Sequence, residues 1–150
     1  MSNVIIIGNG PAGVSAALYT SRAGISTLII AKDAGALEKA EKIENYFGFG
    51  EPISGKELSE RGIAQAKRLG VEFLNDEVVS LEYDGQLGVV TKNNRYAAEA
   101  VILATGAPRV APRIKGLKEF EGAGVSYCAI CDGFFYKEKD VAVLGCCEYA

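Results

Sequence analysis

The apolar positions near the start of the chain predict two buried strands with a helix between them. A fully apolar run, Val4 to Ile7, and a second run over residues 26–30 are typical of parallel strands buried on both faces. Between these runs, a face of small and apolar residues repeats at helical spacing: Val14, Ala17, Leu18 and Ser21. Gly24 is suited to ending that helix. Strand, glycine turn, helix and strand form one right-handed βαβ unit.

The middle of the chain predicts a second helix and several short strands. Residues 54–70 form an amphipathic helix, whose inward face consists of Leu58, Ile63, Ala66 and Leu69. Short strands over residues 71–74, 77–83 and 87–91 are predicted to form an antiparallel meander, with turns at 84–85 and 93–94. A buried strand over 100–103 then ends in a further glycine turn, and residues 32–53 are predicted to be irregular.

The last part of the chain predicts a linker and the start of another domain. Residues 108–120 contain two prolines and four basic residues, which is typical of a linker. A cysteine-bearing segment follows, and then a predicted strand over 140–144 and Gly145 repeat the pattern seen at the N-terminus. We expect an α/β protein with a first domain over 1–112 and a second beginning in 113–150.

Composition narrows the classes of function. The chain has 150 residues, 49% of them hydrophobic, and a net charge of -3, which gives no reason to expect nucleic acid or a membrane as partner. The apolar runs are too short for a transmembrane helix, and no signal segment precedes the first strand, so we expect a cytoplasmic protein. Four cysteines and no histidine exclude a Cys-His nucleophile within this sequence.

A glycine fingerprint follows the first strand. Gly8, Gly10 and Gly13 form G-x-G-x-x-G, which allows a tight turn, close approach of a pyrophosphate, and close packing of helix on strand. We therefore predict a dinucleotide site, the alternative being a purely structural turn. The acid expected at the end of the second strand is missing, because Ala31 and Lys32 stand there. This disfavours NAD and leaves FAD.

Cys128 and Cys131 form a C-x-x-C motif, followed by Asp132, which could carry a proton. Cysteines at this spacing can close a small, rapidly exchanging disulfide ring. Two alternatives remain: buried, inert cysteines, or half of a zinc site completed by Cys146 and Cys147. Adjacent cysteines rarely ligate one metal together, so we predict no metal and favour the redox interpretation.

Four segments carry a family resemblance: GNGPAG, IENYFGF, ILATGA and, above all, CAICDGFFY. They resemble the low-molecular-weight thioredoxin reductases, including the ferredoxin-dependent flavin enzymes of that group, although Ile130 replaces the usual threonine. The resemblance implies a Rossmann-like FAD-binding domain with a three-layer parallel sheet and antiparallel meander, then the start of a second nucleotide-binding-type domain carrying the disulfide. It also implies a homodimer and a longer protein, whose later segment completes the FAD domain.

The resemblance further implies roles for individual residues. Cys131 would face the flavin, Cys128 would attack the disulfide of the partner, and Asp132 would be the acid/base. The pyrophosphate of FAD would be held by Gly8, Gly10, Pro11, Ala12 and Gly13. The ribose would lie near Ala31 and Lys32, and the adenine near Val78. The flavin would lie near Asn45, Thr105 and Gly106, and Leu37 and Ala104 would be further cofactor-binding residues. The family often has G-Q-L where this chain has Gly35-Ala36-Leu37, which lacks the glutamine.

The end of the chain bears on the electron donor. The family receives NADPH at a second glycine turn, but Cys147 stands here at its second glycine and Glu148 adds negative charge. We therefore predict flavin-dependent reduction of thioredoxin or a thioredoxin-like protein, with ferredoxin as the donor. The alternatives are an NADPH-dependent thioredoxin reductase, a peroxiredoxin-linked oxidoreductase, and a non-catalytic redox-sensing flavin-binding module.

Overall fold

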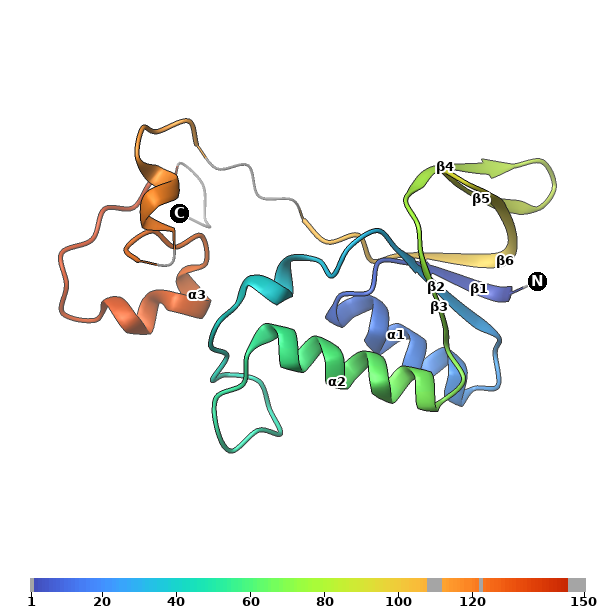
Figure 1. The fold of residues 1–150 in the computed structure, drawn as a ribbon, viewed down its shortest axis with the longest axis horizontal. Coiled ribbons are helices and arrows are strands. Elements are labelled where there is room, and N and C mark those ends of the chain that lie inside the picture. Colours follow the sequence, from blue (N-terminus) through green and yellow to red (C-terminus); the bar gives the residue numbers. More distant parts are fainter. Residues whose placement is uncertain (1, 108–111, 122, 146–150) are drawn as a thin grey trace. The chain divides into compact units, whose positions relative to one another are not determined.

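The computed structural model describes residues 2–107, 112–121 and 123–145. The chain divides into two compact units, Met1–Pro108 and Arg109–Ala150. Each unit is described by itself. The first contains the sheet and the two long helices, and the second consists of short helices and loops (Figure 1).

The first unit is built on one mixed sheet in the order β3-β2-β1-β6-β5-β4. The strands β3, β2, β1 and β6 run parallel, whereas β6, β5 and β4 pair antiparallel. Their bounds are β1 Ser2–Ile7, β2 Thr27–Ala31, β3 Glu72–Asn75, β4 Val78–Tyr83, β5 Leu87–Thr91 and β6 Arg95–Leu103. The predicted α/β class with a Rossmann-like parallel sheet and a meander is confirmed.

The long strand β6 joins the two parts of the sheet. Its first residues, from Arg95 to Ala98, pair antiparallel with β5. From Ala98 onward it pairs parallel with β1, up to the pair Ile7 and Leu103. The sequence predicted only its second half, because the residues before Ala100 lack a continuous apolar run.

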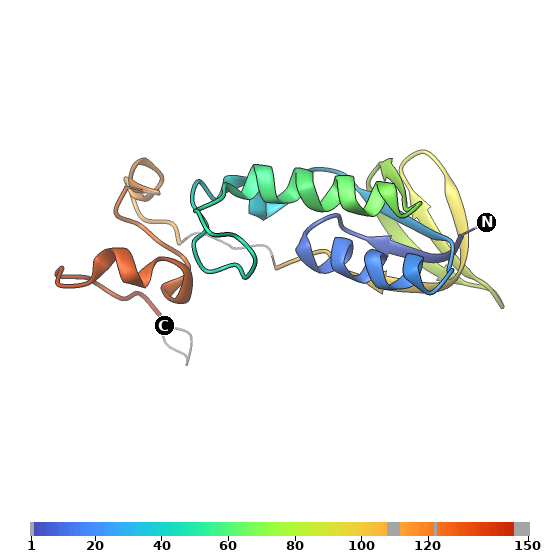
Figure 2. The same ribbon diagram turned by 90° about the horizontal axis from the view of Figure 1, so that it is seen from below.

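Two helices cover one face of the sheet, and each begins as its sequence suggests. The helix α1, Pro11–Arg22, has Pro11 at its start, and Gly24 follows its end with φ +76°. The helix α2, Gly55–Arg68, is capped by Ser54, whose hydroxyl accepts the Glu57 N–H at 3.1 Å. Figure 2 shows the two helices side by side along the sheet.

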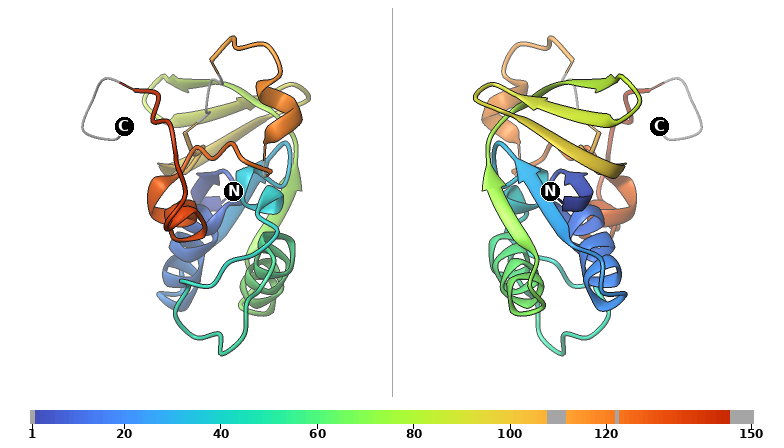
Figure 3. Two further views of the ribbon diagram at one scale, coloured as in Figure 1. Left: turned by 90° about the vertical axis from the view of Figure 1, so that its left-hand side faces the viewer. Right: turned by 90° about the vertical axis from the view of Figure 1, so that its right-hand side faces the viewer.

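Alternate side chains of the central strands point to opposite faces of the sheet, so the strands lie between a layer of helices and the meander. Val4, Ile6 and Ile29 pack against Val14, Ala17 and Ala66 of the two helices, whereas Ile5, Ile7, Leu28 and Ile30 face the meander and pack with Val89 and Ala98. Figure 3 shows the helices beneath the sheet and the meander above it. Strands buried on both faces need apolar residues at every position, which explains the continuous runs in β1 and β2.

One strand was assigned to the wrong partner. The sequence predicts residues 71–74 as part of the meander, but β3 pairs parallel with β2 at the far edge of the sheet. Leu28 lies opposite Glu72, and Ala31 lies opposite Asn75. Because a four-residue strand carries no signal for its partner, the short distance to β4 along the chain was misleading.

The described part of the second unit contains three short helical segments: the 3-10 helix η2, Leu117–Phe120, the helix α3, Ala129–Asp132, and the 3-10 helix η3, Gly133–Tyr136. The predicted strand over 140–144 is wrong, since residues 140–145 have no regular structure. Val141, Val143 and Leu144 are exposed. A parallel strand exists only when its backbone pairs with a neighbour, and no neighbour pairs with it among the described residues.

Candidate functional site

The glycine turn lies at the carboxyl end of β1, beside the end of β6. The Gly8 N–H donates to the Ile30 carbonyl at 2.9 Å, and the Ala104 N–H donates to the Ile7 carbonyl at 2.9 Å. A β-carbon on Gly8 would lie 2.2 Å from the Ala104 carbonyl oxygen. The chain leaves β1 toward β2, while β6 lies on the opposite side, so this edge is a topological switch point where open α/β sheets bind ligands.

Gly10 differs from its neighbours in the turn. A β-carbon there would meet nothing within 4 Å, so its face is open, whereas the β-carbon of Gly13 would overlap backbone. Gly10 is the N-cap of α1 and provides no side-chain cap, and the first turn carries no acid. The N–H groups of Ala12 and Gly13 therefore lack intrahelical partners, and no acidic side chain of the first turn competes for them. These features fit a pyrophosphate.

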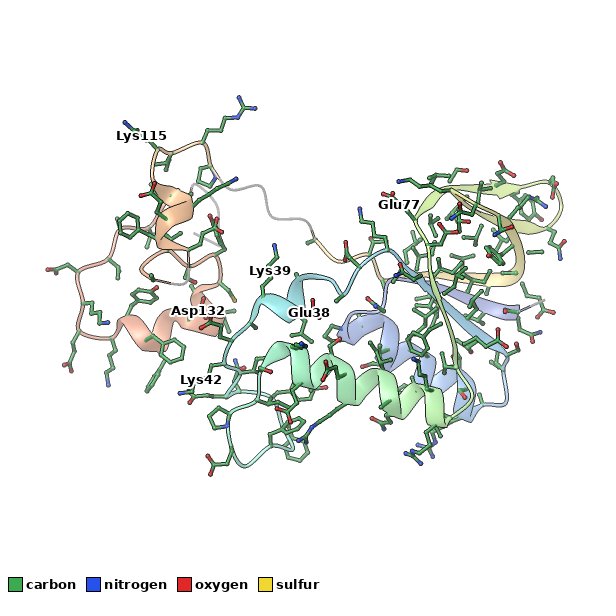
Figure 4. The ribbon with its side chains drawn as sticks, in the orientation of Figure 1. Glu38, Lys39, Lys42, Glu77, Lys115 and Asp132 are labelled. Atoms are coloured by element: carbon green, nitrogen blue, oxygen red, sulfur yellow. The ribbon has the colours of Figure 1, made fainter. Side chains whose placement is uncertain are left out.

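The residues after β2 form an ion-pair cluster with the start of β4. Glu77 pairs with Lys32, at 3.3 Å between Nζ and Oε1, and with Lys92. The Lys92 and Lys32 ammonium groups lower the pKa of Glu77, and Glu77 raises the pKa of Lys92. Figure 4 shows Glu77 at the beginning of β4. Lys32, predicted near the ribose, is thus held by a carboxylate from the turn between β3 and β4.

Asp76 connects two turns beside this cluster. Its side chain is 9% exposed, and its Oδ1 accepts from the Asn93 amide at 3.0 Å and from the Glu77 N–H at 2.8 Å. A hydrogen bond with the Thr91 hydroxyl is the largest cause that lowers the pKa of Asp76. The network fixes the start of β4, where the predicted adenine contact Val78 lies. The Val78 side chain packs into the core, so its backbone is the part available to a ligand.

The predicted flavin contacts lie in separate segments of the first unit. Ala104, Thr105 and Gly106 follow β6, next to the glycine turn, and Gly106 has φ +73°. Asn45 is exposed in the aromatic loop between Ile43 and Ile53, whose backbones pair at the base of that loop. Leu37 lies in the 3-10 helix η1, Ala36–Lys39, which packs on the start of α2. The Thr105 side chain is exposed as well.

The cysteine motif lies in the second unit, in and just before α3. Cys128 is disulfide-bonded, and the side chain of Cys131 lies outside the described part of the structure. The Asp132 N–H donates to the Cys128 carbonyl at 2.9 Å. The Asp132 carboxylate accepts from the Ser126 hydroxyl at 2.5 Å, and the Ser126 oxygen accepts from the Cys128 N–H at 3.1 Å. Sequence reasoning missed Ser126, and Figure 4 shows Asp132 on α3.

Aromatic residues lie before and after the C-x-x-C motif along the chain. The Tyr127 hydroxyl donates to Glu121 at 2.8 Å, and this hydrogen bond raises the pKa of Tyr127, which remains a neutral phenol at neutral pH. Phe134 and Phe135 are 77% and 43% exposed and meet edge to face, with ring centroids 6.2 Å apart. An exposed aromatic pair beside a disulfide offers apolar surface to a protein partner.

Comparison with known proteins decides the family. The pyridine nucleotide-disulphide oxidoreductase family matches residues 2–148. The chain belongs to this family. Membership confirms the predicted oxidoreductase class, and together with the fit of the glycine turn it supports FAD as the cofactor.

The curated relatives that match the chain include thioredoxin reductases. That of Aquifex aeolicus is 44% identical over 152 residues, covering 99% of this chain and 47% of that protein. That of Bacillus subtilis is 46% identical over 147 residues, covering 95% and 46%. The chain therefore spans about half the length of the curated relatives it matches.

Solved structures agree with this placement. The atypical thioredoxin reductase from Desulfovibrio vulgaris Hildenborough has a TM-score of 0.69 at 48% identity, covering 91% of this chain and 46% of that chain. The thioredoxin reductase from Streptococcus pyogenes has a TM-score of 0.81 at 38% identity, covering 91% and 45%. The predicted resemblance to the low-molecular-weight thioredoxin reductases is confirmed, while the ferredoxin-dependent branch stays a prediction.

The described residues contain no helix long and apolar enough to cross a membrane. Within the same residues, no group of three His, Cys, Asp or Glu side chains could hold a metal ion. The sulfur of Cys128 is in a disulfide, and zinc binds thiolates rather than disulfide sulfur. Cys146 and Cys147, the other half of the zinc alternative, lie outside the described residues.

Proposed function

We propose that the protein is a flavoprotein that reduces the disulfide of thioredoxin or a thioredoxin-like protein. The observation that carries this proposal is the C-x-x-C motif, in which Cys128 is disulfide-bonded and adjoins Asp132 through a backbone hydrogen bond. The thioredoxin reductases that match 91–99% of the chain support it. We assign Cys131 as the second sulfur of the disulfide.

The first unit would hold FAD, with the pyrophosphate at the open face of Gly10 and the N-terminus of α1. Ala31 and Lys32 would lie near the ribose, the Val78 backbone near the adenine, and Leu37, Asn45, Ala104, Thr105 and Gly106 near the flavin. When bound, FAD supplies a carrier that accepts electrons singly or in pairs and passes a pair to the disulfide, which becomes two thiols with the uptake of protons.

The residues of the second unit carry out the exchange with the partner. Asp132 accepts the proton of the Cys128 thiol, and the resulting thiolate attacks the partner disulfide. A bond forms between Cys128 and one partner sulfur, while the other partner sulfur leaves and takes the proton from Asp132. Cys131 then gives its proton to Asp132 and attacks Cys128 as a thiolate, which restores the disulfide. The second partner sulfur leaves and takes that proton from Asp132. The partner gains two electrons and two protons, which the cysteine pair loses.

For the electron donor we propose a ferredoxin-like protein. The support comes from the amino-acid sequence, because residues 146–150 of the second glycine turn lie outside the described structure. Cys147 would place a side chain where a pyrophosphate needs bare backbone, and Glu148 would add a repelling charge near that phosphate. An NADPH-dependent thioredoxin reductase is the second candidate, favoured by the family to which the chain belongs.

We further propose a homodimer in the cytoplasm, with residues 1–112 as the FAD-binding domain and 113–150 as the start of the second domain. A redox-sensing module would share these features but would not turn over, and a peroxiredoxin-linked oxidoreductase would use another disulfide partner.

The experiment is anaerobic mixing of the oxidised full-length protein with reduced ferredoxin, NADPH or NADH, following the flavin absorbance, and then addition of oxidised thioredoxin. We expect rapid bleaching by ferredoxin, slow bleaching by both pyridine nucleotides, and recovery of the absorbance with thioredoxin. Rapid bleaching by micromolar NADPH would restore an ordinary NADPH-dependent enzyme. Bleached protein that thioredoxin fails to reoxidise would exclude the reductase function.

A further inference from the structure

We propose that Ser126 is a positioning residue of the redox centre, whose hydroxyl holds the Asp132 carboxylate in a fixed relation to Cys128. The inference rests on the proposed function, in which Asp132 carries the proton of the exchange. It adds a residue that lies outside the C-x-x-C-D motif.

The geometry forms a closed ring of hydrogen bonds. The Cys128 N–H donates to the Ser126 oxygen at 3.1 Å, and the Ser126 hydroxyl donates to Asp132 Oδ2 at 2.5 Å. The Asp132 N–H returns to the Cys128 carbonyl at 2.9 Å. Cys128 and Asp132 are therefore linked twice, once through the backbone of α3 and once through the serine side chain. All three residues are partly buried.

The serine hydroxyl has one proton to give, and two acceptors lie near it. The Cys128 carbonyl oxygen is 3.4 Å away, whereas the Asp132 oxygen is 2.5 Å away and carries charge. Hydrogen bonds to a charged acceptor are shorter and stronger than neutral ones, so the carboxylate receives the proton. The lone pairs of the same oxygen remain available to the Cys128 N–H.

This arrangement restricts a side chain that would otherwise rotate. The Asp132 carboxylate can occupy several staggered positions, and a group that transfers a proton must lie within hydrogen-bond reach of the reacting sulfur. A fixed donor on one oxygen selects one orientation and leaves the other oxygen free to exchange a proton. Without Ser126 the carboxylate would spend part of its time turned away, and the exchange would slow.

The consequence depends on the leaving group. A dialkyl disulfide releases a basic thiolate, which needs a proton as it leaves. Dithiobis(nitrobenzoate) releases a weakly basic aryl thiolate, which leaves without a proton. Loss of the positioning serine should therefore slow reduction of the first class more than the second, because both need the Cys128 proton removed but only the first needs it delivered to the leaving sulfur. A merely structural role in the loop would affect both classes equally.

The test uses anaerobically photoreduced full-length protein in single-turnover reactions with hydroxyethyl disulfide and with dithiobis(nitrobenzoate). We expect Ser126→Ala to slow the dialkyl reaction about tenfold, the value of one hydrogen bond, and to change the aryl reaction less than about twofold. Ser126→Thr keeps a hydroxyl and should restore most of the rate. In the Asp132→Asn background, Ser126→Ala should cause no further loss, since the serine acts through the carboxylate.

The inference would be overturned if Ser126→Ala slowed the reduction of both disulfides equally. It would also be overturned if the rate losses of Ser126→Ala and Asp132→Asn were fully additive. An Ser126→Ala variant with the wild-type rate on hydroxyethyl disulfide would overturn it too. Failure of the proposed function has a different signature: wild-type protein that reduces both small disulfides but not thioredoxin. In that case the ratio between the two small disulfides still decides the role of Ser126.

Discussion

Gly13 lies directly against the carbonyl oxygen of Gly8: a β-carbon built on Gly13 would stand 1.9 Å from that oxygen. This contact holds the first turn of α1 against the end of β1. Gly10, between the two, has an open face. Glycines of a single fingerprint thus perform two separate tasks, close packing and access to a ligand.

The two tasks can be separated by mutation. Gly13→Ala should destabilise the fold by about 1–3 kcal/mol, as expected for overpacking against backbone. Gly10→Ala, at φ -69°, should leave the urea midpoint nearly unchanged but reduce the FAD retained after purification. Urea unfolding and the ratio of flavin to protein absorbance measure both effects. Retention of full flavin by Gly10→Ala and the bulkier Gly10→Val would contradict a pyrophosphate at this turn.

The cysteine assignment predicts different outcomes for the two serine variants. Cys128→Ser should abolish reduction of thioredoxin while the flavin still bleaches with the donor, since the attacking sulfur is gone. Cys131→Ser should trap a stable mixed disulfide between Cys128 and thioredoxin, visible on non-reducing gels, because the resolving sulfur is missing. Cys146→Ser serves as control and should turn over normally. A normal rate in either of the first two variants would refute the assignment.

The exposed aromatic pair predicts a contact with the protein partner. Phe134→Ala should raise the KM for thioredoxin about tenfold, in the range of a buried aromatic contact at an interface, and leave reduction of hydroxyethyl disulfide unchanged. Phe120→Ala removes an aromatic side chain from η2 that is 56% exposed, and provides a matched control. Equal effects of the two substitutions on KM would argue against a specific contact at Phe134.

The lowered pKa of Glu77 predicts how stability depends on pH. Its two lysine partners favour the ionised form, so its contribution is present above the ordinary carboxyl pKa and is lost as the pH falls through the lowered value. Glu77→Gln should therefore lower the urea midpoint at about pH 7, and this effect should shrink as the pH falls through the lowered pKa of Glu77. Glu99→Gln, which removes a carboxylate without an ion pair among the described residues, should show no such dependence.

The parts of the fold that the sequence predicted have local causes. β1 and β2 are buried on both faces, so their residues are apolar without interruption. The Ser54 side chain caps the start of α2, and Gly24, which has no side chain, adopts the positive φ that follows the end of α1. The partner of β3 could not be predicted, because pairing is decided by distant residues. The strand expected at 140–144 failed for the same reason, since an apolar run becomes a strand only beside another strand.

The same distinction applies to the candidate site. The turn at Gly8 and Gly13 follows from spacing alone, because the physical constraints on a tight turn fix which positions must be glycine. Ser126 and Asp76 were missed, since a serine in a loop and an aspartate in a turn are ordinary in sequence. Their importance comes from the partners that the fold brings to them, Asp132 in the one case and Asn93 in the other.

The hydrogen bond from the Ala104 N–H to the Ile7 carbonyl also has a consequence for the order of events during synthesis. The cofactor turn is translated well before the backbone that supports it, which is translated only after β6. Until Ala104 has left the ribosome, the turn can form its hydrogen bond with Ile30 of β2 but lacks the support of β6 on its other side. Loading of the flavin is therefore expected to follow release of nearly the whole first unit from the ribosome.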